Sequence, residues 1–344
     1  TIAAKFGRLA ACVARDKEID EIFRIIKGGR QSVLLTGEQG VGRMSIIYGI
    51  AQRMLADDVP ERIQDKRLVQ ISTSALLAGA TVSGAQERLI QVMNEVAKAK
   101  NIILVIENVH DLVSITSSGG EGLDVSETLA EYLGNGSFLT LATTTTTGYN
   151  RHIVNSAVGQ VFAKVEISEM DENQAIQVLE SKVGSLEYKH KVFFSYDAIE
   201  ACVSLATKFL HDNNLPENAL SLITETGSYV ESAKGQKQLV TKEDVGTIVA
   251  QKTGIPTTSI TEDESEKLMR LEAELHKRVI GQDEAVISVA NALRRARAEI
   301  RSSKKPIATF LFLGPTGVGK TELAKTFADV FFVGEGRMIR FDMS

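Results

Sequence analysis

The chain has 344 residues, with 39 lysine and arginine residues against 44 aspartate and glutamate residues, for a formal net charge of −5. This length predicts two or three domains, and 43% hydrophobic with 24% charged residues is typical of globular protein rather than of a disordered or fibrous chain. The acidic balance disfavours nucleic-acid binding, so we expect no nucleic-acid partner. No apolar run approaches the roughly 18 residues that cross a bilayer, so we expect no membrane association and a cytoplasmic location.

Short apolar segments alternate with helical patterns through the first half of the chain. Residues 102–106 form an unbroken apolar run, which favours a central strand of a parallel sheet covered on both faces. The expected strands are 32–36, 67–71, 102–106, 138–143 and 161–167, and the expected helices are 45–55 and 86–99. The pattern predicts an α/β domain over residues 1–168, with a parallel five-stranded sheet and flanking helices.

The pattern becomes wholly helical after Asp171, which predicts a helical lid domain over residues 169–236. Ser195 is a suitable helix cap within it. Residues 237–277 are expected to form a linker and helices, and residues 278–344 the start of a second, truncated α/β domain. Because the sequence lacks an initiator methionine and its last four residues look like a new β-strand, we expect a fragment of a longer chain.

An internal repeat gives the clearest sign of how the chain is organised. Residues 15–19 precede a strand and then a glycine-rich turn at 37–44. The same order returns with residues 282–286, a strand expected at 309–313 and a glycine-rich turn at 314–321. One structural unit therefore begins twice.

The second glycine-rich turn is a complete phosphate-binding loop, or P-loop. Its residues are Gly314, Pro315, Thr316, Gly317, Val318, Gly319, Lys320 and Thr321, and a helix is expected to follow. Glycines let backbone N–H groups wrap a phosphate, and the N-terminus of the following helix favours its negative charge. We expect Lys320 to reach the outer phosphates of ATP and the Thr321 hydroxyl to bind Mg²⁺.

The first turn keeps the glycines of such a loop but changes two residues that carry its chemistry. It consists of Gly37, Glu38, Gln39, Gly40, Val41, Gly42, Arg43 and Met44. Arg43 keeps a positive charge but is bulkier and forked, and the thioether of Met44 is a poor ligand for a hard cation. Two interpretations stay open: weak or metal-independent nucleotide binding, or an empty loop that is kept as structure.

Glu107 and Asn108 follow the third expected strand, where an ATPase of this type needs an aspartate for Mg²⁺ and a glutamate to activate water. Asn108 cannot accept a proton from water. Glu107 could act as the base only if the register shifts by one residue, and Ile106 would then stand at the metal position. Since one function is missing in either register, we expect no intact catalytic residue in the first domain. We expect capping or solvated roles for His110 and Asp111.

These motifs resemble the Clp class of AAA-plus protein unfoldases, which are double-ring ATPases. The resemblance covers nearly the whole chain. It rests on residues 15–19, 37–42, 58–60, 75–80, 94–98 and 142–144 in the first module and on residues 253–256, 278–286, 294–298 and 310–325 in the second. It implies an AAA-plus fold for both modules and a homo-hexameric ring. By the same resemblance, Val279 and Ile280 contact the nucleotide, and Thr143 or Thr144 points toward its phosphates.

The departures from the family pattern concentrate on chemistry. Residues 81–83 stand where the family has a pore-loop aromatic, and residues 159–161 stand where it has arginines that reach the neighbouring subunit's ATP. Asn218 stands where a lysine is usual in the lid. Together with the changes in the first loop and after the third strand, these departures suggest a first module that neither hydrolyses ATP nor grips a polypeptide strongly.

The resemblance implies an ATP-dependent protein unfoldase or chaperone subunit, in which the second module is the motor and the first is a non-hydrolysing assembly platform. Protein substrates are expected partners, together with a ClpP-type peptidase or an adaptor. The alternative is a regulatory or scaffolding homologue that joins hexamers without unfolding activity. A nucleic-acid remodelling ATPase is disfavoured by the charge balance. The fragment alone is expected to be inactive, because its intact P-loop lacks the rest of its own sheet.

Overall fold

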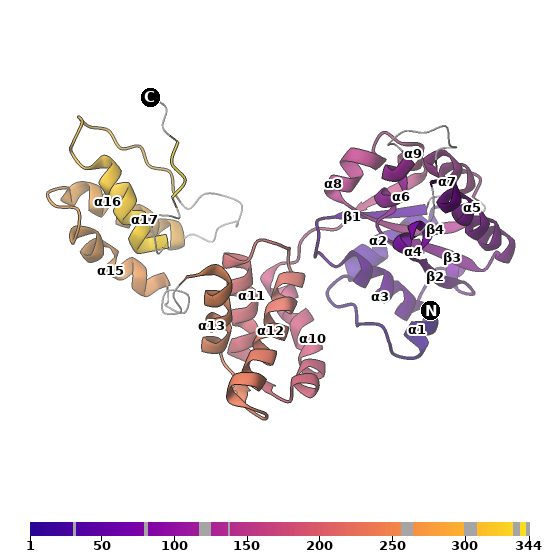
Figure 1. Cartoon of the computed structure of the whole chain (residues 1–344), viewed down its shortest axis with the longest axis horizontal. Coiled ribbons are helices and arrows are strands. Elements are labelled where there is room, and N and C mark those ends of the chain that lie inside the picture. The colour runs from indigo at the N-terminus through magenta and orange to yellow at the C-terminus, as the bar shows by residue number, and fades with distance from the viewer. Residues whose placement is uncertain are drawn as a thin grey trace. The chain divides into compact units, whose positions relative to one another are not determined.

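The computed structural model describes residues 1–29, 32–78, 82–116, 125–136, 138–255, 264–298, 308–332 and 338–341 (Figure 1). The chain divides into two compact units, Thr1–Val245 and Gly246–Ser344. Among the described residues, no helix is long and apolar enough to span a membrane.

The first unit contains a parallel five-stranded sheet, as the sequence predicts. Its strands are β1 (Ser32–Gly37), β2 (Arg67–Ile71), β3 (Ile102–Ile106), β4 (Leu139–Thr145) and β5 (Phe162–Glu166). They lie in the order β2-β3-β4-β1-β5. The carboxyl ends of β1, β3 and β4 therefore meet at one edge, which is where open α/β sheets bind their ligands.

Helices cover both faces of the sheet because side chains alternate along each strand (Figure 1). The helices and helical turns of this domain are α1 (Ile2–Lys5), α2 (Asp16–Lys27), α3 (Arg43–Leu55), η1 (Glu61–Ile63), α4 (Thr73–Leu77), α5 (Val82–Ala99), α6 (Val109–Thr116), α7 (Val125–Gly134), α8 (Thr146–Gly148), η2 (Tyr149–Ile153) and α9 (Ala157–Val161). Val33 and Leu35 of β1 pack with α2 and α3 on one face. Leu34 faces the other way, into a cluster with α5, α6 and α7.

The lid consists mainly of the helices α10 (Glu172–His190), α11 (Tyr196–Phe209) and α12 (Glu217–Lys234), and α13 (Lys242–Thr253) follows it. A capping box starts α10: the Asp171 side chain accepts from the Gln174 N–H, and the Gln174 side chain accepts from the Asp171 N–H. Ser195 caps α11, as predicted, by accepting from the N–H of Ala198.

The expectation of a wholly helical lid is wrong in one place. Phe193 and Phe194 form β6, Leu239 and Val240 form β7, and the two strands pair in parallel. Each strand has two residues, which are too few to show an alternating pattern, and the partner lies far along the chain. β7 therefore occupies part of the segment that the sequence predicts as a linker, and it ties that segment to the start of α11.

The second unit is a helical cluster. Its helices are α15 (Glu264–His276), α16 (Asp283–Ala298) and α17 (Lys320–Phe332). They pack through buried apolar residues, which are Leu268, Leu271, Leu275, Val279, Val286, Val289, Ala290, Leu293 and Leu323. The three leucines of α15 recur at helical spacing and face this core, as the sequence predicts.

The strand expected at 309–313 is not formed. Residues 308–315 have no regular structure. Phe310 and Phe312 still pack against the helices, whereas Leu311 and Leu313 are each 82% exposed, so the alternation of a strand is present. A strand needs a hydrogen-bonding neighbour, and the described part of this unit contains no second strand. The strand expected at 341–344 lies outside the described residues except for Phe341, which is irregular.

Candidate functional site

The first glycine-rich turn joins β1 to α3 at the carboxyl edge of the sheet. Gly40 and Gly42 have φ angles of 88° and 89°, in the left-handed region that favours glycine. Gly42 is the N-cap of α3, which begins at Arg43. The turn therefore has the wrapped backbone and the following helix of a P-loop.

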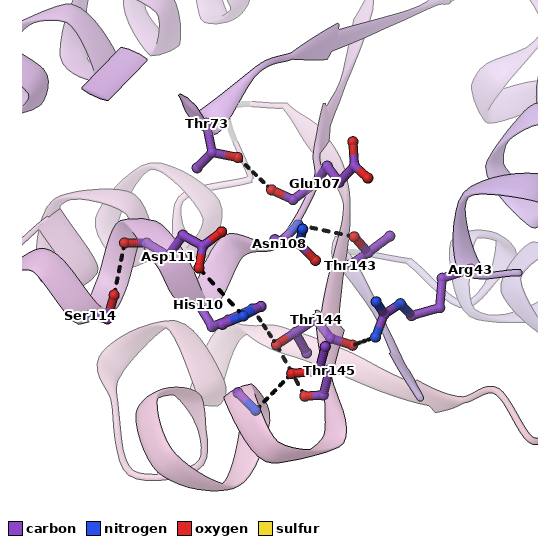
Figure 2. A network of polar contacts seen from close by, with 11 residues as sticks. Arg43, Thr73, Glu107, Asn108, His110, Asp111, Ser114, Thr143, Thr144 and Thr145 are labelled. Atoms are coloured by element: carbon purple, nitrogen blue, oxygen red, sulfur yellow. Dashed lines mark hydrogen bonds and ion pairs between the residues drawn. The ribbon is translucent and has the colours of Figure 1, made fainter. Parts of the chain in front are cut away.

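The guanidinium of Arg43 bonds back onto the sheet. Its Nη1 donates to the carbonyl oxygen of Gly37. It also donates, at 2.7 Å, to the carbonyl oxygen of Thr144 on β4 (Figure 2). Burial lowers the pKa of Arg43, and the carboxylates of Glu107 and Glu38 oppose that shift. Arg43 thereby joins the ends of β1 and β4, with its charge at the position that the lysine occupies in an intact P-loop.

The neighbours of Arg43 in the loop belong to the core. Val41 is buried, and Met44 packs at the border of the apolar cluster formed by α2, α3 and one face of the sheet. A thioether there offers no oxygen ligand to Mg²⁺. Among the described residues, no group of three or more His, Cys, Asp or Glu could hold a metal ion.

Glu107 and Asn108 follow β3 at the same edge (Figure 2). Gln70 Nε2 donates to Glu107 Oε2 at 3.1 Å, and Thr73 Oγ1 donates to the carbonyl oxygen of Glu107 at 2.6 Å. Asn108 has a φ of 50°, and its backbone N–H donates to Thr143 Oγ1 at 3.1 Å. The structure thus brings Glu107 and Asn108 next to the loop. The neutral side-chain amide of Gln70 is the hydrogen-bond partner of the Glu107 carboxylate.

His110 connects the start of α6 to the end of β4. Its Nδ1 lies 3.0 Å from Thr144 Oγ1, and its Nε2 lies 3.5 Å from Asp111 Oδ1. Burial lowers the pKa of His110, Asp111 opposes this shift and Arg43 adds to it. The sequence suggested a capping or solvated residue, but His110 is a half-buried bridge. Thr143 and Thr144, one of which is expected to point toward the phosphates, both use their hydroxyls to contact groups that follow β3.

Two of the other altered positions lie in the lid and at the end of α9. Asn218 is buried in the lid, where its Nδ2 donates to the carbonyl oxygens of Leu210 at 3.1 Å and Asn213 at 3.2 Å. It braces the turn before α12. Residues 159–161 end α9, and residue 81 of the expected pore loop lies outside the described residues.

The second glycine-rich turn leads directly into α17. Gly317 has a φ of 86°, and the helix begins at Lys320. Lys320 Nζ donates to the carbonyl oxygens of Gly314 at 2.8 Å and Pro315 at 2.7 Å. The lysine therefore folds onto the first glycine of its loop, as the arginine of the first loop does. Thr321 is exposed in the first turn of α17.

A cavity of about 390 Å³ borders the second loop. Its walls come from the loop, from the segment before it and from α16, and they include Phe310, Leu311, Phe312, Leu313, Val318, Gly319, Lys320 and Gln282. Val279 is buried in the helical cluster, and Ile280 is 88% exposed. The contact of these two residues with a nucleotide stays a prediction.

Sequence reasoning gave no role to Arg15 and Gln282, which open the two copies of the repeat. Arg15 Nη2 donates to the carbonyl oxygen of Val41 at 2.7 Å. Gln282 Nε2 donates to the carbonyl oxygen of Val318 at 2.9 Å. Val41 and Val318 occupy the same position in their loops, so equivalent side chains hold equivalent carbonyl groups. The repeat itself was the signal that could have identified them.

Three protein-family models match the chain. The model of the ATPase family associated with various cellular activities (AAA) matches residues 33–169. The AAA lid domain matches residues 171–277, and the AAA domain of the Cdc48 subfamily matches residues 305–344. The matches follow the order of sheet domain, lid and second loop.

Curated relatives match along the whole chain. The chaperone protein ClpB of Oceanobacillus iheyensis is 34% identical. The negative regulator of genetic competence ClpC/MecB of Bacillus subtilis is 33% identical, and the ATP-dependent Clp protease ATP-binding subunit ClpC of Staphylococcus aureus is 34% identical. Each match covers 100% of this chain and 50% of the relative. The chain therefore spans about half the length of the curated relatives it matches.

Solved structures of Hsp104 also match nearly the whole chain. The Hsp104–ADP complex of S. cerevisiae superposes with a TM-score of 0.90 at 32% identity, and the match covers 99% of this chain and 59% of that one. The extended conformation of the S. cerevisiae Hsp104–casein complex matches with a TM-score of 0.72 at 34% identity over the same shares.

Proposed function

Because the chain belongs to the Clp and Hsp104 family of AAA-type ATPases, we propose that it works as part of an ATP-dependent protein-unfolding chaperone. In this proposal the second module hydrolyses ATP, and the first is a non-hydrolysing assembly platform. The contrast between the two loops carries the proposal. Lys320 and Thr321 begin α17 in the second loop, whereas Arg43 is tied to β4 and Met44 packs at the core in the first.

The residues of the second loop fit Mg-ATP. Lys320 would hold the outer phosphates, Thr321 would hold Mg²⁺ through its hydroxyl, and the backbone N–H groups before α17 would surround a phosphate. When bound, Mg-ATP supplies the free energy of phosphoryl transfer. Gln282 holds the carbonyl group of Val318, which keeps the loop in shape.

The segment after β3 in the first module lacks the pair of carboxylates that ATP hydrolysis needs. Asn108 can orient a water molecule but cannot take its proton. Glu107 is one methylene longer than the aspartate of the family and accepts a hydrogen bond from Gln70. Both loops place a cation on the carbonyl of their first glycine. The second acceptor of Arg43 is Thr144 on β4, and that of Lys320 is Pro315.

The proposal extends to assembly, partners and boundaries. We propose a homo-hexameric ring that acts on protein substrates in the cytoplasm, with a ClpP-type peptidase or an adaptor as a further partner. Support comes from the Hsp104–casein complex and from the relative named as a subunit of the Clp protease. We place domain boundaries after residues 168, 236 and 277, and the matches that end at residues 169 and 277 support the first and the last.

The alternative is a regulatory or scaffolding homologue that joins hexamers without unfolding its partners. The concentration of changes around the first loop favours it. ATP-dependent unfolding of a fluorescent protein with an unstructured tail separates the two functions, and it should be measured on the protein at its natural length. We expect loss of fluorescence with ATP, abolished by Lys320→Ala and retained in the control Lys325→Ala on the same helix. A hexamer that binds the tagged protein but never unfolds it supports the scaffold instead.

A further inference from the structure

Arg15 connects three parts of the first module. Its side chain is buried, and Nη1 forms an ion pair with Glu18 at the start of α2. Nη2 donates to the carbonyl oxygen of Val41 in the altered loop at 2.7 Å and to that of Ser168 at 2.9 Å. Ser168 follows β5, where the chain leaves the sheet domain for the lid. One guanidinium thus holds the loop and the hinge together.

The lid contacts the same loop from the other side. The Nδ2 and the backbone N–H of Asn214, in the turn before α12, both donate to the carbonyl oxygen of Gln39, at 2.9 and 3.3 Å. Gly40 lies so close to the lid that a Cβ there would stand 2.9 Å from Glu217 Cβ. The N–H of Leu215 donates to Glu169 Oε1 in the hinge at 2.8 Å.

These contacts close a circuit from Arg15 to the loop, from the loop to the lid, from the lid to the hinge and back to Arg15. We propose that this circuit, the lid latch, holds the lid of the first module against its loop without a nucleotide, and that Arg15 is its positioning residue. The lid latch consists of Arg15, Gln39, Glu169 and Asn214. The inference rests on the proposed function, because a platform that does not hydrolyse ATP needs another means of fixing its lid.

The second module repeats one contact of the latch. Gln282 stands at the position of Arg15 in the repeat and makes the contact to the loop valine. The fork of an arginine offers several donors with fixed geometry, so Arg15 can bond to the hinge as well. The contact with the loop is therefore common to both modules.

The physical properties of the contacts favour a latch that stays closed. Hydrogen bonds from a charged guanidinium are among the stronger ones in proteins. Arg15 fixes the loop and the hinge in this way. Opening the lid would then break both hydrogen bonds from Asn214 to the Gln39 carbonyl group and the one from the Leu215 N–H to the Glu169 carboxylate. A ligand shifts such an equilibrium only by its differential affinity for the two states. Because the lid is already held, ADP should change its position little.

Hydrogen exchange of the amides of Asn214 and Leu215 measures the latch directly, since one donates to the loop and the other to the hinge. In the protein at its natural length we expect slow exchange without nucleotide and no further slowing with saturating ADP. Asn214→Ala should speed exchange of the turn by about fivefold, because it removes one hydrogen bond to the loop. The matched control is Asn213→Ala, whose side chain has no hydrogen bond among the described residues. Fast exchange that slows only with ADP would overturn the proposal.

Variants of Arg15 and Glu169 test the hinge contact. Arg15→Gln copies the second module, so it should keep the loop contact and speed exchange at Leu215, and Arg15→Lys should restore part of the protection. If Arg15→Gln does not fold, variants of the exposed Glu169 test the hinge contact instead. Glu169→Ala should speed exchange at Leu215. Glu169→Gln keeps the hydrogen-bond acceptor and should leave that exchange unchanged. Equal exchange in both variants of Glu169 contradicts the latch. Loss of unfolding activity in the Lys320→Ala variant leaves these rates unchanged, so the two proposals fail separately.

Discussion

Arg43 and Lys320 occupy the same position in two loops and share one contact. Each donates to the carbonyl oxygen of the first glycine of its loop. Arg43 also reaches Thr144 at the end of β4, so the first loop is fastened to a neighbouring strand. The longer, forked side chain makes that second contact possible. In the first module, Arg43 therefore ties its loop to the edge of the sheet.

Replacing Arg43 with alanine should destabilise the first unit. The change leaves the carbonyl groups of Gly37 and Thr144 without their donor, and we expect a loss of about 1–3 kcal/mol in the free energy of unfolding. Arg43→Lys should lose less, because a lysine can bond to the first glycine as Lys320 does. Urea unfolding, followed by circular dichroism, measures both. An alanine variant as stable as the wild type would show that these contacts carry no net energy.

His110 should make the first unit less stable in acid. Burial lowers its pKa below the ordinary value of 6.5, Asp111 opposes the shift, and Arg43 and His152 add to it. The folded protein then binds fewer protons than the unfolded one. Stability is therefore lost as the pH falls below the pKa that the histidine has in the unfolded chain. His110→Gln should flatten the dependence of the urea midpoint on pH between about pH 7 and about pH 5. An unchanged slope would assign the acid sensitivity to other groups.

Two helices of the lid show how packing decides the effect of a glycine. Gly184 lies in α10, and a Cβ there would meet nothing within 4 Å. Gly227 lies in α12, where a Cβ would stand 2.9 Å from Phe194 Cζ on β6. The small parallel pair β6–β7 thus packs against α12 at a point where only glycine fits without a shift.

The same substitution should have opposite effects at these two positions. Gly184→Ala should stabilise the lid by about 0.5–1 kcal/mol, because alanine favours a helix over glycine and the site is open. Gly227→Ala should destabilise it by about 1–3 kcal/mol through overpacking against the aromatic ring. Thermal unfolding of the two variants beside the wild type gives the comparison. Equal effects of one sign would mean that the ring of Phe194 moves freely.

The sequence predicts elements where local pattern and burial agree. The strands expected at 67–71 and 102–106 have those bounds in the structure. The apolar run at 102–106 is buried between two helical layers, whereas 67–71 is an edge strand in which only Leu68 is buried. β6 and β7 were missed since two-residue strands have no period, and the strand at 309–313 lacks a partner. The residues of the two glycine-rich loops could be identified from the spacing of their glycines. Asn214 could not, because it bonds to a backbone carbonyl group that leaves no trace in the sequence, and only the internal repeat points to Arg15.

At the scale of the whole molecule, the two compact units should respond differently to nucleotide. ADP with Mg²⁺ should raise the unfolding temperature of the second unit, since a ligand at 100 times its Kd stabilises a folded state by about 2.7 kcal/mol. The first unit, with its lid already held, should shift little. Calorimetry with and without ADP on the protein at its natural length gives both transitions. The shift should vanish in Lys320→Ala, and a shift of the first transition alone would reverse the assignment.

ATP turnover should belong to the second module alone, and steady-state Mg-ATP hydrolysis by wild type, Lys320→Ala and Arg43→Ala tests this most directly. We expect Lys320→Ala to lower turnover by at least about 100-fold, because the loop loses the cation that holds the phosphates. Arg43→Ala should keep turnover close to that of the wild type wherever the variant still assembles. Substantial turnover that survives Lys320→Ala would contradict the account and would mean that the first module hydrolyses ATP, with Glu107 as its base.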